Sequence, residues 1–567
     1  MTPLIDKSKK LKNLISSYES AELLTFIAGL LVKIPTRNNN PFFKFLKSPL
    51  RQLFYLAILN IESTEPVKDK KVSSEEEWDE LAKLLDEIEM EYFMMLGFPK
   101  NGEETKEDVD KLLLTLPTYL NYFFNGPLSF VEQDIYRIEN TFLNYKSIIF
   151  DKTGICLDDF IKFFYFVNDV IEYNLNYAFR TGIEWKNCIE KGIKPEEWEI
   201  SSQEELEAWG NLIQNPGSYL VLDIEKIDFS TFEKSKFIDI ISLFIIKEKN
   251  NDNIRLYTEK NPITEKPFFK INDKKYLPIF FKQYLNSLYD FLFELCKENI
   301  GANKILKSRD KFLETKTKEV FENFLKKEAF YYYNYSVDNN ISEQDLLVVF
   351  KKNLLIIEMK ASLQREPMRD FEKAYKKLES DFEKSIQKGY EQCFRVKEII
   401  NNHNKLVIKD KNKRTLYELK NLDKYNIHTI VVTNDRLGNV QTNLYNLLEL
   451  NENDDRFPWC VNIDDLEVFL LALKKKSGYK SSFINFLDYR ELFHGTLMCS
   501  DELELCGFYF SNQLDFIKYA KMEDKIFCTE HETSTIFDKL YNSGLGFKNE
   551  RNLIKKKDKR VYNIFSS

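Results

Sequence analysis

The sequence predicts a mixed α/β fold in which a central sheet is flanked by helices and lies between two largely α-helical regions. Three observations predict this fold class. Apolar residues recur at three- and four-residue intervals through most of residues 1–300, the spacing of helices that bury one face. Two short apolar runs, 345–350 and 354–360, follow a helical segment, and a third at 427–433 follows another. Helices alternating with short strands in this order are typical of a sheet covered by helices.

The length of the chain predicts more than one domain. At 567 residues the chain is longer than one hydrophobic core usually organises, and with 43% hydrophobic residues it has enough apolar side chains to fill several cores. We expect a helix-rich region at 1–300, with room for two subdomains and a role in sensing or assembly. A central α/β domain at 301–445 and a helical C-terminal region at 446–567 complete the predicted organisation.

Helical spacing in the N-terminal region is clearest in three segments, 20–34, 75–96 and 157–179. In each segment, apolar residues recur three or four positions apart. A stretch at 218–246 is rich in Ile, Leu and Val and is interpreted as β-forming. The N-terminal region is therefore predicted to be mainly helical with a small β component.

The central domain begins with a helical segment at 311–330, which leads into the two apolar runs. A long charged segment at 369–400 follows, and its apolar residues have the spacing of one helix face. The lysine-rich segment 405–420 is predicted to be a loop that could approach a phosphate backbone, although a solvated loop is the simpler interpretation. Four tyrosines before the first strand are interpreted as packing residues rather than as a base-stacking surface. Either Asn462 or Asp464 could cap the first C-terminal helix.

Charge and cysteine patterns argue against several functional classes. The net charge of −8 gives the whole protein no attraction for polyanions, so any nucleic-acid binding must be local. No two of the eight cysteines have the C-x2-C spacing of a zinc or redox site, which indicates reduced thiols and a cytoplasmic protein. The apolar run 23–32 is too short to cross a bilayer, so no membrane partner is expected. No Walker phosphate loop is present, which argues against a nucleotide-driven motor.

The two apolar runs at 345–350 and 354–360 predict a β-hairpin with acidic residues at its open end. If the chain reverses at Lys351-Lys352, Asp345 lies directly opposite Glu358. Opposed residues on antiparallel strands have Cβ atoms about 5 Å apart, close enough for two carboxylates to share one cation. Side chains two positions apart on a strand point the same way, so Lys360 joins Glu358 on that face.

Two carboxylates and one ammonium at the end of a strand suit phosphodiester hydrolysis with Mg²⁺ or Mn²⁺. Mg²⁺ typically takes one or two protein carboxylates and fills its remaining positions with water and phosphate oxygens. Asp345 and Glu358 would hold the ion, with the backbone carbonyl of Met359 as a further ligand. Lys360 would orient or deprotonate the attacking water.

These residues resemble the signature of the PD-(D/E)XK nuclease superfamily. The matching stretch is EQDLLVVFKKNLLIIEMKAS, which supplies Asp345, Glu358, Met359 and Lys360, while Gln344 replaces the proline of the signature. The resemblance covers about 130 residues and implies a restriction-endonuclease-like central sheet flanked by helices. A sheet edge that carries Asp, Glu and Lys as a solvated salt bridge is the alternative to this interpretation.

The resemblance also implies residues on the two flanking helices. Many members place an acid on the helix before the first strand and a glutamine on the helix after the second. Glu322 fits the first role, and Glu319 and Glu328 could also fill it. Gln392 fits the second role, and Gln387 could also fill it.

The expected function is that of a Mg²⁺-dependent endo- or exodeoxyribonuclease in bacterial antiphage defence or DNA processing. DNA is the expected substrate and RNA the alternative. A homo-oligomer or a partner defence protein is compatible with this class, because two active sites are one way to cut two strands. The alternative function is a nucleic-acid-binding or protein-scaffold module that retains a non-cleaving nuclease fold.

Overall fold

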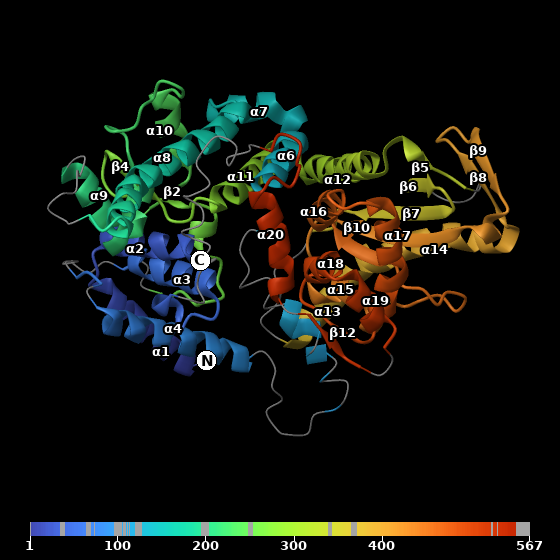
Figure 1. Cartoon of the computed structure of the whole chain (residues 1–567), viewed down its shortest axis with the longest axis horizontal. Helices are drawn as coiled ribbons and strands as arrows, with labels where there is room; N and C mark the ends of the chain where they lie inside the picture. Colours follow the sequence, from blue (N-terminus) through green and yellow to red (C-terminus); the bar gives the residue numbers. More distant parts are fainter. Residues whose placement is uncertain are drawn as a thin grey trace. The chain divides into compact units, whose positions relative to one another are not determined.

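The computed structural model contains two compact units, each of which is described by itself below (Figure 1). Unit 1 comprises Met1–Met95 and Phe123–Ala302, and unit 2 comprises Leu96–Tyr122 and Asn303–Ile554. The structure describes residues 2–34, 40–63, 70–72, 74–95, 105, 109, 111–112, 114–118, 128–193, 203–247, 253–337, 343–363, 371–522, 525–529 and 531–550.

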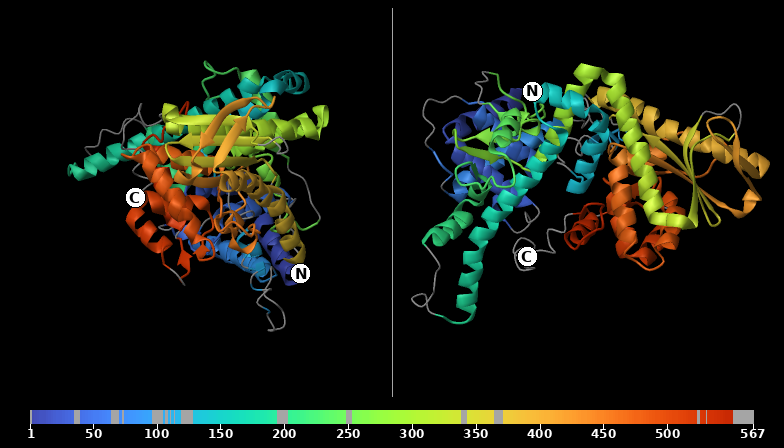
Figure 2. Two further views of the ribbon diagram at one scale, coloured as in Figure 1. Left: turned by 90° about the vertical axis from the view of Figure 1, so that its right-hand side faces the viewer. Right: turned by 90° about the horizontal axis from the view of Figure 1, so that it is seen from above.

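Unit 1 is mainly helical, and the three segments with the clearest helical spacing are confirmed as helices. They form α2 (Ser20–Val32), α4 (Glu75–Met95) and α8 (Leu157–Glu190). At 34 residues, α8 extends about 50 Å, and Figure 2 shows it as a long teal helix. The other helices of unit 1 are α1 (Thr2–Ser16), α3 (Pro49–Ile61), α6 (Val131–Phe142), α7 (Lys146–Thr153), α9 (Gln203–Gln214), α10 (Lys234–Leu243) and α11 (Gln283–Ile300).

The small sheet of unit 1 has the strand order β1-β4-β3-β2. Its strands are β1 (Leu222–Asp223), β2 (Ile245–Ile246), β3 (Phe268–Lys270) and β4 (Lys275–Pro278). The stretch 218–246 was expected to form β-structure and contains β1 and β2, but most of its second apolar run lies in helix α10. Phe237, Ile240 and Ile241 are fully buried on one side of α10. Short apolar runs fit a strand or a buried helix equally well by periodicity alone, and here burial of one helical face decides the outcome.

Unit 2 is organised around a five-stranded mixed sheet with the order β11-β10-β7-β6-β5. Strands β5, β6 and β7 are antiparallel neighbours, whereas β10 runs parallel to both β7 and β11. The bounds are β5 (Ala329–Tyr335), β6 (Gln344–Phe350), β7 (Asn353–Lys360), β10 (Asn426–Thr433) and β11 (Trp459–Asn462). The mixed α/β class and the three apolar runs are thus confirmed. The tyrosine segment before them is an additional edge strand.

Strand β11 changes the predicted domain boundaries. The boundary between the two units lies at 302/303, close to the predicted 300/301. By contrast, residues 446–567 do not form a separate helical region, because Trp459–Asn462 pairs with Ile430–Thr433 and completes the central sheet. The helices that follow β11, up to Asn542, belong to the same compact unit as the sheet.

Helices cover both faces of the five-stranded sheet. Helix α12 (Ala302–Leu325) contacts β5 through Tyr331, whose hydroxyl donates to the Phe321 carbonyl. The charged segment 369–400 forms α13 (Phe371–Phe382), a π-helical turn and α14 (Lys388–His403). Because neighbouring strand residues point to opposite faces, the contact of Tyr331 with α12 places α12 on the face opposite Tyr332.

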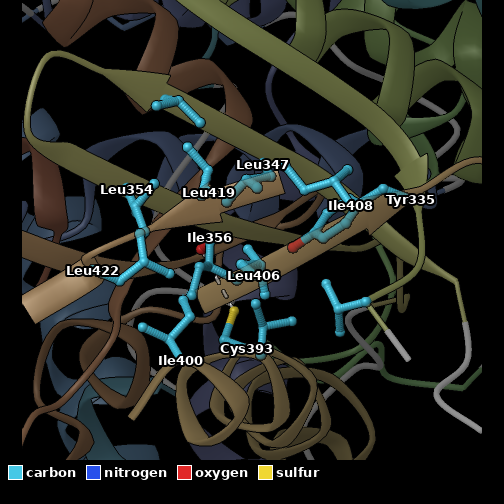
Figure 3. Close-up of a cluster of buried hydrophobic side chains, with 13 residues drawn as sticks. Tyr335, Leu347, Leu354, Ile356, Cys393, Ile400, Leu406, Ile408, Leu419 and Leu422 are labelled. Atoms are coloured by element: carbon cyan, nitrogen blue, oxygen red, sulfur yellow. Dashed lines mark hydrogen bonds between the residues drawn. The ribbon is translucent and has the colours of Figure 1, made fainter. Parts of the chain in front are cut away.

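Helix α14 packs on the face of the sheet that carries Leu347 and Ile356. The Cys393 thiol lies 3.6 Å from the Ile356 carbonyl and 3.8 Å from the Ile430 carbonyl, so α14 crosses both β7 and β10. Figure 3 shows the buried cluster between the helix and the sheet. The same cluster contains residues of β8 (Lys405–Lys409) and β9 (Thr415–Lys420), which form an antiparallel hairpin where a loop was expected.

The remaining elements of unit 2 follow β10 in the sequence. Asn462 caps α16 by accepting a hydrogen bond from the Asp464 N–H, which decides between the two predicted caps. Among the described residues, no helix is long and apolar enough to span a membrane. The elements are α15 (Asn439–Thr442), α16 (Ile463–Leu473), α17 (Tyr479–Arg490), β12 (Leu497–Met498), α18 (Glu502–Ser511), α19 (Gln513–Ala520), β13 (Phe527–Cys528) and α20 (Thr535–Asn542).

Candidate functional site

Asp345 and Glu358 lie opposite one another at the open end of the β6–β7 hairpin. The chain reverses at Lys351-Lys352, where Lys351 adopts φ 53, and the register pairs Phe350 with Asn353. The last paired residues are Leu346 and Ile357, so the next residues on the two strands are the two acids. The predicted turn and register are confirmed.

Hydrogen bonds to the backbone of the neighbouring strand fix both carboxylates. The Met359 N–H donates to Asp345 Oδ2 at 2.7 Å, and the Asp345 N–H donates to Glu358 Oε1 at 3.3 Å. Each acid therefore accepts a hydrogen bond across the hairpin. These two hydrogen bonds orient the carboxylates toward each other. They also fix the direction of the carboxylate lone pairs that accept no hydrogen bond from the hairpin.

Lys360 joins the two acids and connects them to α14. Its ammonium lies 3.4 Å from Glu358 Oε2, and it also donates to the side-chain carbonyl of Gln392. The structure therefore brings together four of the predicted residues, Asp345, Glu358, Lys360 and Gln392. The competing glutamine, Gln387, lies elsewhere, where it donates to the Glu449 carbonyl at 3.1 Å.

Burial and charge repulsion raise the pKa of Glu358 to about 8. Burial contributes most because the side chain is fully inaccessible, and the nearby Asp345 carboxylate adds to the effect. The positive charge of Lys360 acts in the opposite direction but does not cancel them. The pair consequently favours either a shared proton or an added cation at neutral pH.

Two acids of α12 interact with Asp345, and neither of them is Glu322, the acid that the sequence analysis favoured. Glu322 accepts a hydrogen bond from the Tyr333 hydroxyl at 2.7 Å. Burial raises the pKa of both Asp310 and Glu314, and the charge of Asp345 contributes to both shifts. Glu314 lies eight residues before Glu322, or about 12 Å along the helix. Asp310 and Glu314 are thus the acids that α12 presents toward the hairpin end.

The spacing of these two acids can be seen in the sequence, but it does not select them over the other acids of the helix. Asp310 and Glu314 are four residues apart, which places them on one helix face beside the buried Arg309 and Leu313. Glu328, which the sequence also offered for this role, forms an ion pair with Lys480 instead. Sequence alone does not show how far along the helix the sheet ends, and the position of the acid depends on that distance.

The residues at the hairpin end fit a hard divalent cation. Among the described residues, no group of three or more His, Cys, Asp or Glu side chains is arranged as a metal site. Mg²⁺ needs only one or two carboxylates, however, and Asp345 and Glu358 provide two. The buried Tyr335 hydroxyl has no hydrogen-bond partner in the described part of the chain, and burial together with the charge of Glu358 raises its pKa. The site therefore contains polar atoms that an ion with bound water would satisfy.

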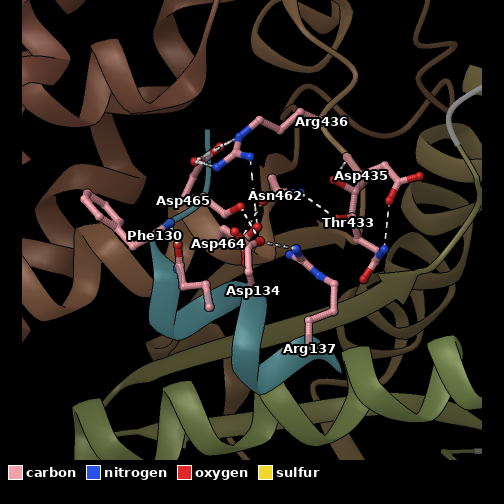
Figure 4. Close-up of polar contacts among 12 residues, drawn as sticks. Phe130, Asp134, Arg137, Thr433, Asp435, Arg436, Asn462, Asp464 and Asp465 are labelled. Atoms are coloured by element: carbon pink, nitrogen blue, oxygen red, sulfur yellow. Dashed lines mark hydrogen bonds and ion pairs between the residues drawn. The ribbon is translucent and has the colours of Figure 1, made fainter. Parts of the chain in front are cut away.

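A polar network supports the end of β7 that carries Lys360. The Asn434 N–H donates to the Lys360 carbonyl at 3.2 Å, which extends the pairing with β10. Arg309 donates to the Ala361 carbonyl at 3.4 Å and to Asp435 at 2.9 Å. The Thr433 hydroxyl donates to the Asp435 carbonyl, and Asn462 at the end of β11 donates to the Asn434 carbonyl. Figure 4 shows Thr433, Asp435 and Asn462. This end of the sheet is therefore braced by β10, β11 and α12.

The neighbouring ion pair of Arg436 also appears in Figure 4. Its guanidinium lies 2.7 Å from Asp465 and 4.0 Å from Asp464, at the start of α16. Burial raises the pKa of Asp465 to about 7, although Arg436 opposes this shift. The ion pair fixes the segment after β10 to α16.

Comparisons with known proteins identify no relative of this chain. Scans against family models, curated proteins and solved structures find no match to this chain.

Proposed function

We propose that the chain is a metal-dependent nuclease that hydrolyses phosphodiester bonds, with DNA as the expected substrate. The observation that carries the proposal is the exchange of hydrogen bonds between Asp345 and the Glu358-Met359 segment, with Lys360 adjacent. The buried carboxylate of Glu358, the half-buried carboxylate of Asp345 and the Lys360 ammonium at the end of a hairpin form the arrangement that the PD-(D/E)XK resemblance implies.

The order of elements in unit 2 also supports the proposal. Helix α12 precedes three antiparallel strands, α14 follows them, and β10 adds a parallel strand. This is consistent with a restriction-endonuclease-like sheet flanked by helices. The site lies where β7 ends and α14 begins its crossing, and the side chains of both elements meet at Lys360 and Gln392.

Asp345 and Glu358 would hold a Mg²⁺ or Mn²⁺ ion, with the Met359 carbonyl as a further predicted ligand. When bound, such an ion lowers the pKa of a coordinated water and offsets the charge that develops on the phosphate. Lys360 would orient the attacking water by a hydrogen bond as the ammonium, or take its proton as the neutral amine and return it later. Gln392 keeps the Lys360 ammonium at the site by accepting a hydrogen bond from it.

Asp310 and Glu314 are proposed as additional acids of the same site. Both interact with Asp345, and Asp310 also interacts with Lys360. Their charges increase the negative potential at the hairpin end, which favours a divalent cation. That Glu322 is a further acid of the metal site stays a prediction. In the structure it accepts a hydrogen bond from Tyr333 of β5, which attaches α12 to the sheet.

The test is cleavage of linear, circular and single-stranded DNA and of RNA in Mg²⁺, in Mn²⁺ and in EDTA. The proposal expects cleavage that requires the ion and that Lys360→Ala abolishes. The matched control is Lys352→Ala, which removes an exposed lysine from the turn at the other end of the same hairpin and should leave activity unchanged.

A folded wild-type protein that binds nucleic acid but cleaves none of these substrates would support the non-cleaving module instead. In that case isothermal titration with Mn²⁺ should show no difference between the wild type and Asp345→Asn. A role in antiphage defence or DNA processing, and a homo-oligomer or partner defence protein, remain predictions from the resemblance.

A further inference from the structure

We propose that the β8–β9 hairpin is a binding arm for a single-stranded segment of nucleic acid that leads to the site at Asp345. The proposal names a substrate class for the nuclease function above and rests on it for the role of the arm in cleavage. Binding by the arm can be measured without cleavage. The arm is defined as residues 405–420.

The arm carries a concentrated positive charge in a protein whose net charge is −8. Within its 16 residues the arm has six basic side chains, Lys405, Lys409, Lys411, Lys413, Arg414 and Lys420. It has only two acidic side chains, Asp410 and Glu418. The three at the tip, Lys411, Lys413 and Arg414, are all exposed. Charge complementarity therefore favours a polyanion as the partner of this surface.

The acids of the arm are engaged within the hairpin. The Asp410 carboxylate accepts hydrogen bonds from the Asn412 and Arg414 N–H groups, both at 2.8 Å, and so stabilises the turn at the tip. Glu418 lies 3.6 Å from Lys420 at the base. The tip therefore combines a well-formed turn with exposed basic side chains.

The arm is fixed to the sheet that carries the site. Leu406, Ile408 and Leu419 are buried in the same cluster as Leu347 and Ile356, as Figure 3 shows. Ser336 and Lys409 exchange backbone hydrogen bonds of 3.0 and 2.8 Å, which attaches β8 to the chain just after β5. A phosphate bound at the tip would consequently have a defined position relative to the sheet.

Lys409, the last residue of β8 before the tip, lies at the same end of the sheet as the acids. Tyr335 pairs with Gln344, the residue before Asp345, and Ser336 follows Tyr335. Since neighbouring strands are about 4.8 Å apart, Lys409 lies about 10 Å across the sheet from the strand of Asp345. The chain turns directly after Lys409, at residues 410–414. A strand bound by the tip therefore reaches the site within a few nucleotides.

Aromatic rings beside the basic residues favour a single strand over a duplex. Tyr417 on β9 is 53% exposed and stacks on Tyr332 of β5, with ring centroids 6.3 Å apart. Phe330 lies two residues before Tyr332 on the same side of β5 and is 69% exposed. Exposed rings next to a basic strip can stack on unpaired bases, whereas the bases of a duplex are already stacked on one another.

The experiment measures fluorescence anisotropy of a labelled 20-nucleotide single strand, as DNA and as RNA, and of the matching DNA duplex. All titrations contain EDTA, so binding is measured without cleavage. Lys411→Gln/Lys413→Gln/Arg414→Gln should weaken single-strand binding at least tenfold and reduce the slope of log K against log salt by about 2. The control Lys9→Gln/Lys10→Gln/Lys226→Gln removes the same charge from exposed positions of unit 1 and should change neither quantity.

A second variant tests the aromatic rings. Phe330→Ala/Tyr417→Ala should weaken binding of the single strand about tenfold or more while leaving the salt slope and duplex binding unchanged. An unchanged salt slope in the tip variant, or equal losses for single strand and duplex in the aromatic variant, would overturn the proposal. Preference for DNA over RNA, or the reverse, identifies which single strand the arm accepts.

The outcomes separate this proposal from the nuclease function. If the arm variants lose binding but the wild type cleaves no substrate with Mg²⁺ or Mn²⁺, the nuclease proposal is wrong and the proposal that the arm binds single strands is supported. If the wild type cleaves but the tip variant retains its binding and its kcat/KM, the arm proposal fails alone. The tip variant changes only exposed side chains, and a thermal melt within about 2 °C of the wild type confirms that it is folded.

Discussion

Gly389 on α14 lies so close to Val431 on β10 that a Cβ atom at Gly389 would be 2.8 Å from Val431 Cγ1. The same atom would be 3.5 Å from Cε of Lys360. The helix that carries Gln392 can therefore approach the end of β7 only because residue 389 has no side chain. Val431 is fully buried in β10, between β7 and β11, so it has little room to move.

Replacing Gly389 with alanine should displace α14 and separate Gln392 from Lys360. We expect a loss of about 1–3 kcal/mol in the free energy of unfolding from overpacking, and about a tenfold loss of kcat. Urea denaturation and steady-state cleavage measure the two effects. The control is Gly210→Ala in α9, where a Cβ atom would meet nothing within 4 Å, and this variant should be as stable as the wild type or more so.

The raised pKa of Glu358 predicts how stability depends on pH in the absence of metal. Because its pKa is about 8 in the folded protein and 4.5 ordinarily, the folded state keeps a proton that the unfolded chain releases. Stability should therefore fall as pH rises from about 5 to about 8, by roughly 3 kcal/mol. Urea denaturation in EDTA at both ends of this range measures the fall.

Glu358→Gln should remove most of this pH dependence, since its side chain has no proton to lose. Glu379→Gln, an exposed glutamate on α13, should retain it. Adding Mg²⁺ should raise the melting temperature of the wild type more at pH 8 than at pH 6, because the ion competes with the proton for Glu358. A pH dependence that Glu358→Gln leaves intact would assign the effect to other groups.

The acids of α12 should differ in their effects on metal binding. Glu314→Gln removes a charge that interacts with Asp345, so we expect the Mg²⁺ concentration for half-maximal cleavage to rise about tenfold. Glu322→Gln weakens the hydrogen bond from Tyr333 and should cost about 1 kcal/mol of stability with the Mg²⁺ requirement unchanged. If Glu322→Gln instead raised the Mg²⁺ requirement and Glu314→Gln left it unchanged, Glu322 would be the acid of α12 that acts at the metal site.

A buried ion pair in the C-terminal part of unit 2 should be essential for stability. Arg490 and Glu502 have side chains that are 1% and 2% exposed, and Glu502 also accepts a hydrogen bond from the Trp459 indole of β11. Glu502→Ala leaves the Arg490 charge buried without its partner and should cost about 3–5 kcal/mol. Glu294→Ala, which breaks the exposed pair with Lys297, should change stability by no more than about 0.5 kcal/mol. Urea denaturation followed by circular dichroism compares the two variants.

The hairpin end could be predicted from the sequence because strand geometry leaves little freedom. A two-residue turn and a side-chain period of two fix which residues oppose each other, so Asp345 and Glu358 follow from the position of Lys351-Lys352 alone. Gln392 depended on the resemblance rather than on such geometry, and the structure places it at Lys360.

Other features depended on packing that local patterns do not encode. Strand β11 has four residues, Trp459–Asn462, and the last of them is already the cap of α16, so the run is too short to show any period. The β8–β9 hairpin has exposed residues at most positions of β9, so it lacks the alternation of a half-buried strand. The choice between Glu314 and Glu322 required knowing where along α12 the sheet ends, which is a tertiary relationship.

The position of β11 in the chain has a consequence for synthesis on the ribosome. All the residues proposed for catalysis have been translated by Gln392, yet the sheet that positions them is completed only by Trp459–Asn462. Until then β10 has one unpaired edge, which can pair with other extended chains. The nascent protein therefore passes through an interval in which its catalytic side chains exist without the full sheet. A fragment ending at residue 445 would be held permanently in that aggregation-prone state.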